Sequence, residues 1–329
     1  MPDHPLTDRI AALWRERFGD AEGLTLAPCA AGGNNRVYRA EAGGRIAAAK
    51  VYFADSRDGR DRLDAEWRFL AYAAGTGIAV TPKPLARDPA ARIALHEFCP
   101  GERPASPDAA AVAAAAALFA DLNRHRAGAD LPAAAEACFS PAAHMALAAG
   151  RLDRLRSVQA AEARHLLGEM EIFWRDYAHR LPGRLDALGI DAGAEIPHAQ
   201  RCVSPSDFGF HNALVEAGGT LRFIDFEYAG WDDPVKMLCD FFLQPAVPVA
   251  AGHYDRFFAA TLGDWPEAER LAARADLMRP VFALKWCCIM LNPFLPEAAA
   301  RARFADPGQD DLHIRRLAAA TDAFRRLKD

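Results

Sequence analysis

Residues 204–228 read SPSDFGFHNALVEAGGTLRFIDFEY and are the most informative stretch of the chain. Two short apolar segments, Ala213–Val215 and Leu221–Ile224, flank a glycine-containing turn, and this arrangement predicts a β-hairpin. In an antiparallel pair, the start of one strand lies beside the end of the other. We therefore expect Asn212 and Asp225, which border the two segments, to lie at the same end of the hairpin.

The polar side chains of this stretch are of the types that phosphoryl transfer requires. Asn212 offers an amide oxygen and Asp225 a carboxylate, and both are hard ligands that suit Mg²⁺. Asp207 precedes Asn212 by five residues, and a carboxylate there can orient a substrate hydroxyl and accept its proton. The spacing of Asp207 and Asn212 alone is common by chance. The added hairpin and its Ile-Asp-Phe ending favour a kinase site over ordinary turn residues.

The stretch resembles the second half of the aminoglycoside phosphotransferase and choline kinase superfamily. The pattern of that superfamily is a His-Gly-Asp-x-x-x-x-Asn loop, a hairpin and an Ile-Asp-(Phe/Trp) strand end, which makes Asp207 the catalytic residue. Residues 226–230, Phe-Glu-Tyr-Ala-Gly, look most like the choline and ethanolamine kinase version. One departure is Pro205, which stands where the superfamily has its histidine. His211 is a candidate for a similar supporting role, and an ordinary loop histidine is the alternative.

The resemblance also implies a nucleotide-binding half within the first hundred residues. Lys50 lies in a β-type run, where a buried charge costs free energy unless it is paired. The chain has only five lysines, so this placement is informative. By resemblance, Lys50 contacts the α- and β-phosphates and pairs with a glutamate of the next helix. Glu66 is the candidate for that partner, and Asp64 is its weaker rival.

Two further segments are implied to contact the nucleotide. Gly33 and Asn34 lie in a Gly-Gly-Asn-Asn turn, where glycine allows the backbone to approach phosphates closely. Glu97 and Cys99 fall where the superfamily has its hinge, which binds adenine through backbone groups. The implied cofactors are Mg²⁺ and ATP, with GTP as the alternative nucleotide.

The order of apolar patterns predicts an α+β fold, and the resemblance implies that this fold is protein-kinase-like. We expect a small N-terminal five-stranded antiparallel β lobe with one helix over residues 1–98, a hinge at 99–104, and a larger, mainly helical C-terminal lobe over 105–329. The expected strands are Leu24–Cys29, Arg36–Glu41, Arg45–Phe53, Pro82–Arg87 and Arg92–Phe98. Helical patterns cover about 6–18, 57–74, 106–125, 142–165, 166–188, 234–243, 250–262, 266–291 and 309–327. Ser106 is the expected cap of the helix after the hinge, and Pro280 is a possible break point.

Composition excludes several other classes of function. A net charge of −5 and a pI near 6.1 argue against nucleic-acid binding. No apolar run reaches the roughly 18–20 residues of a membrane span. The seven cysteines lack framework or zinc-site spacing. These features predict a cytoplasmic protein. With the phosphoryl-transfer motif and the family resemblance, we expect a monomer or homodimer that acts on a small molecule.

The predicted activity is transfer of the γ-phosphate of ATP to a hydroxyl of a small polar metabolite of the choline, amino-alcohol or sugar type. Two alternatives stay open: a kinase of aminoglycoside or macrolide antibiotics, and a catalytically weak nucleotide-binding protein with a kinase fold. Candidate acceptor contacts are Glu227, Trp231, Asp232 and Trp286. Aromatic residues on amphipathic helices more often serve packing, so these positions do not identify the acceptor.

Overall fold

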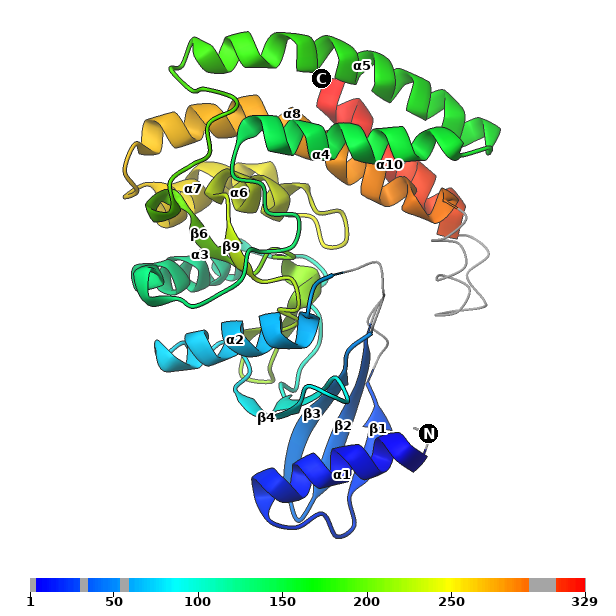
Figure 1. Cartoon of the computed structure of the whole chain (residues 1–329), viewed down its shortest axis with the longest axis vertical. Coiled ribbons are helices and arrows are strands. Elements are labelled where there is room, and N and C mark those ends of the chain that lie inside the picture. Colours follow the sequence, from blue (N-terminus) through cyan, green and yellow to red (C-terminus); the bar gives the residue numbers. More distant parts are fainter. Residues whose placement is uncertain (1–3, 30–34, 54–58, 296–311, 329) are drawn as a thin grey trace. The chain divides into compact units, whose positions relative to one another are not determined.

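The computed structural model describes residues 4–29, 35–53, 59–295 and 312–328 (Figure 1). Its contacts divide the chain into two units. The first unit contains Met1–Ala135 and Val203–Trp231, and the second contains Glu136–Cys202 and Asp232–Asp329. This division differs from lobes at 1–98 and 105–329, so those boundaries stay a prediction.

A five-stranded antiparallel sheet forms the N-terminal part of the first unit, as the sequence predicts. Its strands have the order β1-β2-β3-β5-β4. They are β1 (Thr25–Pro28), β2 (Arg36–Ala42), β3 (Arg45–Val51), β4 (Pro84–Asp88) and β5 (Ile93–Glu97). Helix α1 (His4–Phe18) packs on this sheet through Ile10, Leu13 and Trp14 (Figure 1). The apolar stripe of α1 is therefore used inside the N-terminal core.

Helix α2 (Arg62–Gly75) follows β3 and carries Glu66 on its buried side. We expected this helix to begin at residue 57. That is wrong, because in the described part of the chain the helix begins at Arg62. The helix begins after Asp61, whose side chain accepts a hydrogen bond from Asp64 N at 3.0 Å and so caps it. One turn beyond Glu66, Phe69 stacks on Phe226 with ring centroids 4.6 Å apart.

The predicted hairpin is present in the first unit. Strands β7 (Ala213–Val215) and β8 (Leu221–Phe223) pair antiparallel, with Ala213 opposite Phe223. Ile224 N donates to Asn212 O at 2.9 Å, which extends the ladder by one step. Asn212 and the residue before Asp225 are therefore bonded neighbours at one end of the hairpin.

Helix α3 (Ala109–Arg124) supports the segment that leads to this hairpin. Its cap is Asp108, which accepts from Ala111 N at 2.8 Å, and not the expected Ser106. Near its other end, the buried Asn123 exchanges two hydrogen bonds with the backbone of Val203, at 2.8 and 2.9 Å. Val203 belongs to β6 (Cys202–Ser204), which pairs with β9 (Gly230–Asp232). These strands of three residues each were not predicted, because such short segments show no alternation.

Gly101 joins the segment after the sheet to the hairpin. Glu102 and Val215 exchange backbone hydrogen bonds of 3.2 and 2.8 Å. Gly101 has φ +134°, and a Cβ there would lie 2.5 Å from the carbonyl oxygen of Val215.

We expect Gly101→Ala to lower the free energy of unfolding by about 1–3 kcal/mol, measured by denaturant titration. Gly218→Ala is the control, because nothing lies within 4 Å of its added methyl group; equal stability of the two variants would contradict the prediction.

The second unit consists mainly of helices, of which α4, α5, α8 and α10 lie side by side (Figure 1). The helices are α4 (Pro141–Arg154), α5 (Ala161–Asp186), α6 (Pro234–Leu243), α7 (Tyr254–Leu262), α8 (Ala268–Leu291) and α10 (Leu312–Lys328). The predicted boundary at residues 165–166 is wrong. The chain instead leaves the helix at a 3₁₀ turn, Leu155–Ser157, where Ser157 Oγ donates to Arg154 O. Pro280 lies inside α8 and does not end it.

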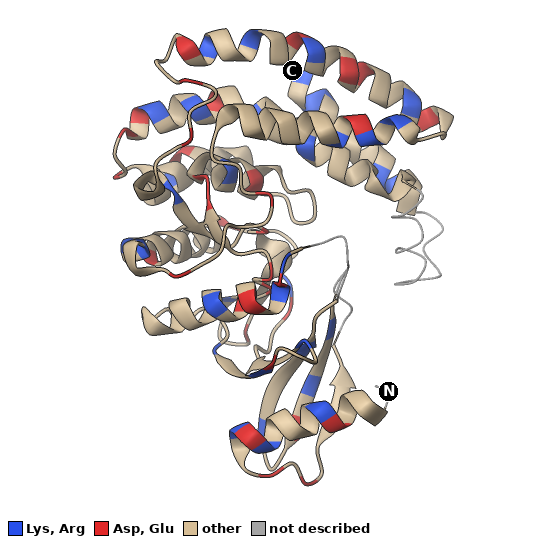
Figure 2. Cartoon of the chain, viewed as in Figure 1, with Lys and Arg blue, Asp and Glu red and all other residues tan. Residues whose placement is uncertain are grey.

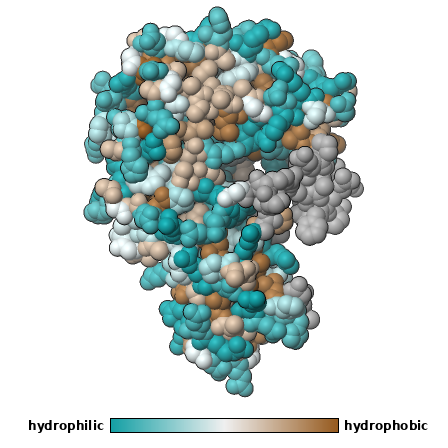
Figure 3. All heavy atoms as spheres, in the orientation of Figure 1, coloured by the Kyte–Doolittle hydropathy of each residue, from teal (hydrophilic) through white to brown (hydrophobic). Residues whose placement is uncertain are grey.

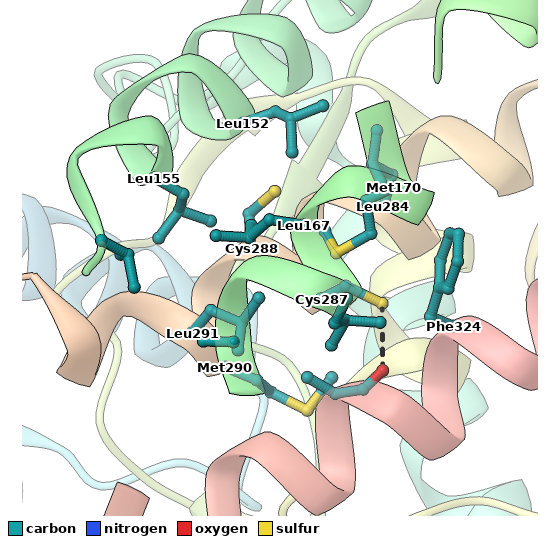
Figure 4. Close-up of a cluster of buried hydrophobic side chains, with 14 residues drawn as sticks. Leu152, Leu155, Leu167, Met170, Leu284, Cys287, Cys288, Met290, Leu291 and Phe324 are labelled. Carbon is teal, nitrogen blue, oxygen red and sulfur yellow. Dashed lines mark hydrogen bonds between the residues drawn. The ribbon is translucent and has the colours of Figure 1, made fainter. Parts of the chain in front are cut away.

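Apolar side chains from α4, α5, α8 and α10 form the core of the second unit (Figure 4). Leu284, Cys287 and Cys288 supply its α8 face, and Phe324 enters from α10. Burial raises the pKa of both cysteine thiols to about 12. The protonated thiols thus act as small apolar groups, and Cys287 Sγ donates a weak hydrogen bond to Ala320 O at 3.8 Å.

Basic and acidic residues are interspersed along α1 and α5 in Figure 2. Hydrophobic residues on the face shown in Figure 3 form small patches among hydrophilic ones. Helices in the described ranges lack the combined length and apolar character that a bilayer span needs.

Candidate functional site

Lys50 lies at the centre of a buried ion cluster in the first unit. Its Nζ donates to Glu66 Oε2 and to Asp225 Oδ1, each at 2.6 Å. Lys50 and Glu66 are 6% and 2% exposed. The rival candidate Asp64 instead contacts Arg68 and Arg87. The structure thus brings three of the predicted site residues together from β3, α2 and the end of the hairpin.

Both partners of the Lys50–Glu66 pair are charged. Burial acts to lower the pKa of Lys50, but the carboxylates of Glu66, Asp225 and Glu227 outweigh it and the net pKa is raised. Burial acts to raise the pKa of Glu66, and the Lys50 ammonium outweighs it, so this pKa is lowered. A buried ammonium is therefore shared between the carboxylates of Glu66 and Asp225.

Asp207 is oriented by two side chains that lie four and five residues further along the chain, His211 and Asn212. His211 Nε2 lies 3.0 Å from Asp207 Oδ1, and an ionised carboxylate can only accept, so the ring donates from Nε2. Asn212 Nδ2 donates to Asp207 O at 3.0 Å and to Oδ2 at 3.2 Å. These contacts hold the carboxylate in place and leave the amide oxygen of Asn212 as an acceptor.

The loop around Pro205 is closed by its own backbone. Asp207 N donates to Pro205 O at 2.9 Å, and Ser206 N donates to Ser204 Oγ at the same distance. Ser206 has φ +65°, a left-handed conformation that few residues adopt. A tight turn thus occupies the place of the superfamily histidine, and His211 is the histidine that contacts Asp207.

Asn212 and Asp225, the predicted Mg²⁺ ligands, carry an amide oxygen and a carboxylate at one end of the hairpin. Asp225 has φ +67° and one carboxylate oxygen on Lys50. No group of three or more His, Cys, Asp or Glu side chains in the described ranges could hold a metal by itself. Mg²⁺ is commonly bound by one or two carboxylates together with waters and substrate phosphates. One amide and one carboxylate oxygen fit that mode of binding.

Glu227 is buried and held by residues of the N-terminal part of the unit. Asn35 Nδ2 donates to its carboxylate at 2.7 Å, and Arg62 approaches at 3.4 Å. Burial raises the pKa of Glu227. Gly33 and Asn34, predicted to cover the phosphates, lie outside the described residues. Asn35 is the first described residue after them, and it contacts the segment after Asp225 through Glu227.

The segment predicted as the hinge continues from β5. The Glu97 carboxylate accepts from Lys83 N at 3.1 Å and pairs with Arg222 at 3.2 Å. The Cys99 thiol is buried, which raises its pKa to about 11. The Glu97 carboxylate is thus engaged by Lys83 and Arg222 and the Cys99 thiol is buried, so any contact with an adenine ring would involve their backbone groups.

The four candidate acceptor residues fall in both units. Glu227 and Trp231 belong to the first, and Trp231 is 7% exposed. Asp232 and Trp286 belong to the second, where Lys236 Nζ donates to Asp232 at 2.7 Å.

Trp286 lies beside a chain of alternating buried charges in the second unit. Its Nε1 donates to Asp240 at 2.8 Å, and Lys285 Nζ lies 2.6 Å from both oxygens of the same carboxylate. Lys236 is 3.6 Å from Asp240, so the chain continues to Asp232. Three of the five lysines are thus buried in ion pairs, and the scarcity of lysine was the signal that could have found Lys236 and Lys285.

Sequence reasoning missed several residues that hold the site in place. Tyr52 and Asn35 contact Glu66 and Glu227, respectively. Arg60 donates to the carbonyl oxygens of Glu227, Ala229 and Ala133, at 2.8 to 3.1 Å. The three partners of Arg60 lie about 70 or more residues away from it in the sequence. No local sequence pattern predicts contacts of this kind.

Solved structures with the same fold are kinases of small molecules. Choline kinase from Cryptosporidium parvum Iowa II has a TM-score of 0.60 and 13% identity, with 98% of this chain and 96% of that chain covered. Choline kinase LicA from Streptococcus pneumoniae has a TM-score of 0.59 and 14% identity, covering 98% and 99%. Aminoglycoside phosphotransferase APH(2'')-Ib in its ADP-bound form has a TM-score of 0.57 and 11% identity, covering 98% of each chain. The fold is therefore the protein-kinase-like fold that the sequence predicts.

A comparison with family models identifies the family of the chain. The model of the phosphotransferase enzyme family matches residues 25–271, about three quarters of the sequence. The chain belongs to this family. No sequence among curated proteins matches it significantly.

Proposed function

We propose that the protein is an ATP-dependent kinase that transfers the γ-phosphate to a hydroxyl group of a small polar metabolite. The observation that carries the proposal is the convergence of Lys50, Glu66 and Asp225 in one buried cluster, with Asp207 and Asn212 at the same end of the hairpin as Asp225. An ion pair that only stabilised the fold would need one carboxylate partner for Lys50, and not a second, partly exposed one such as Asp225. The Asp225 side chain is 38% exposed and remains accessible to a ligand.

Each residue has a defined task in the proposed reaction. Lys50, held by Glu66, binds the phosphates and keeps them in line with the acceptor. Asn212 and Asp225 would hold Mg²⁺, which when bound offsets the negative charge of the transferring phosphoryl group. Asp207 orients the acceptor hydroxyl and accepts its proton. His211 and Asn212 keep the Asp207 carboxylate pointing in a fixed direction.

For the acceptor, we propose an alcohol of the choline, amino-alcohol or sugar type. The Phe-Glu-Tyr-Ala-Gly sequence at 226–230 supports this class, since it resembles the choline and ethanolamine kinase version of the motif. Antibiotic phosphorylation is the second candidate, because similar folds include the streptomycin-ATP complex of APH(2'')-IIa. A nucleotide-binding protein without transfer activity is the third.

The test is ADP release by the full chain with MgATP or MgGTP and a panel of choline, ethanolamine, sugar alcohols, aminoglycosides and macrolides. We expect turnover with one of the first three classes. Turnover confined to the antibiotics would support the second candidate. Nucleotide binding in a thermal-shift assay without turnover on any alcohol would contradict the enzyme proposal.

A further inference from the structure

Glu66 is held by more than its ion pair with Lys50. Tyr52 Oη donates to Glu66 Oε2 at 2.8 Å, and His96 Nε2 lies 3.0 Å from the same phenol oxygen. Phe226 N donates to the other carboxylate oxygen of Glu66 at 3.1 Å. The carboxylate thus joins β3, α2, β5 and the segment immediately after Asp225.

The direction of this hydrogen-bond chain follows from proton counting. The ionised carboxylate of Glu66 accepts only, so the single proton of the Tyr52 hydroxyl must point to Glu66. The phenol oxygen then accepts from His96, which carries its proton on Nε2. His96 Nδ1 is buried without a hydrogen-bond partner, which suits a bare nitrogen and disfavours a second N–H there. Burial accordingly lowers the pKa of His96 to about 4.

Each member of the chain is buried and close to the lysine. Tyr52 is 5% exposed and His96 is 4% exposed. Lys50 Nζ also lies 5.0 Å from the centre of the Tyr52 ring, within the range of a cation–π contact. Tyr52 lies two residues after Lys50, just beyond the end of β3, and its backbone N–H donates to Arg92 O at 2.9 Å. The extended backbone therefore places both side chains on one face. The phenol therefore restricts both partners of the ion pair at once.

We propose that Tyr52 and His96 are positioning residues that fix Glu66, and through it the Lys50 ammonium, in the geometry that receives the phosphates of the nucleotide. The proposal rests on the proposed kinase function. Without the phenol, Lys50 is the one remaining donor to Glu66 Oε2 within the described ranges, and the carboxylate, then held by Lys50 and Phe226 N, can shift. The ammonium would follow it, and a lysine displaced by even 1 Å loses part of its contact with a phosphate.

The decisive variant is Tyr52→Phe, which removes one hydroxyl and keeps the ring over Lys50. We expect its affinity for MgATP and MgADP, measured by calorimetry, to fall about three- to tenfold. Its affinity for adenosine, which has no phosphates, should stay within twofold of wild type. A residue that only stabilises the fold would change all three affinities together or none of them.

Tyr72→Phe is the matched control. Tyr72 is a half-buried tyrosine on α2 whose hydroxyl donates to Leu122 O at 2.6 Å, so it also loses one hydrogen bond. We expect it to lower the melting temperature without changing nucleotide affinity. For the histidine, His96→Leu should weaken MgADP binding, and His96→Gln, which can still donate to the phenol, should restore affinity to within twofold of wild type.

The tautomer of His96 is tested without any nucleotide. In ¹⁵N-histidine NMR spectra we expect a neutral ring with its proton on Nε2 at pH 7, and a changed Nε2 shift in Tyr52→Phe. A ring protonated on Nδ1, or equal binding of MgADP by wild type and Tyr52→Phe, would overturn the positioning role while leaving the kinase proposal intact. If wild type bound no Mg-nucleotide at all, the kinase proposal would fail and the positioning role with it.

Discussion

Replacing Asp207 by asparagine should reduce phosphoryl transfer about 10²- to 10⁴-fold, the usual contribution of a general base. The amide has the size of the carboxylate and can still accept from His211, which lies 3.0 Å from Asp207 Oδ1. It cannot accept the proton of the acceptor hydroxyl. Because Asp207 is not part of the Lys50 cluster, we expect MgATP affinity to change by no more than about twofold, which is about 0.4 kcal/mol.

The measurement is ADP release with the best acceptor of the panel, together with calorimetric binding of MgATP. Asp121→Asn is the control, because Asp121 lies on α3 and pairs with Arg124 on the helix surface. It should retain wild-type turnover. Turnover of Asp207→Asn within tenfold of wild type would remove Asp207 from the role of base.

The parts of the fold that could be predicted are those with a local signature. The hairpin at 213–223 has two apolar segments and a glycine turn, and its strands pair antiparallel as predicted. Strand β3 was predicted from its apolar run, in which Lys50 stands out because the chain is poor in lysine. The resemblance implied a helix glutamate as the partner of Lys50, and helical periodicity indicated Glu66 because it lies near the face of Leu63 and Leu70; all three are buried. The local part of each argument lies within one short window of sequence.

What could not be predicted depends on contacts between distant segments. His96 and Tyr52 meet across 44 residues, and Asn35 meets Glu227 across 192. Nothing in the local sequence of these residues distinguishes them from ordinary buried polar groups. The break between α4 and α5 was misplaced for a related reason. Apolar residues continue through Leu155 and Val158, both buried, although the chain is no longer α-helical there.

The acceptor class was out of reach because its two acidic candidates, Glu227 and Asp232, are buried in internal ion pairs with Arg62 and Lys236. Asp240, which contacts the candidate Trp286, is likewise paired with Lys285. Burial acts to raise the pKa of Asp240, and the ammonium groups of Lys285 and Lys236 outweigh it, so the pKa is lowered. A carboxylate that is already paired does not indicate a cationic substrate, so counting acidic residues in the sequence would have been misleading.

Replacing Lys50 by methionine should weaken MgATP binding at least tenfold. It should also make the fold more stable as the pH falls from 7 to 5, which we do not expect of wild type. In wild type, the Lys50 ammonium lowers the pKa of Glu66 below its ordinary value of 4.5. The ion pair therefore stabilises the fold above pH 4.5, and this contribution is lost as the pH falls below it. Removing one partner of a buried pair commonly costs about 3–5 kcal/mol at neutral pH.

In Lys50→Met, burial acts on Glu66 without the opposing ammonium, so its pKa should rise above the ordinary value of 4.5. Its ionised form then destabilises the fold, and protonation relieves that cost. The melting temperature of the variant should therefore rise as the pH falls from 7 to 5, whereas that of wild type should not. In the double variant Lys50→Met/Glu66→Gln the uncompensated carboxylate is gone, so the melting temperature should recover in part at pH 7 and lose this pH dependence. If the single variant melted in parallel with wild type across that range, Lys50 would not be the group that keeps Glu66 ionised.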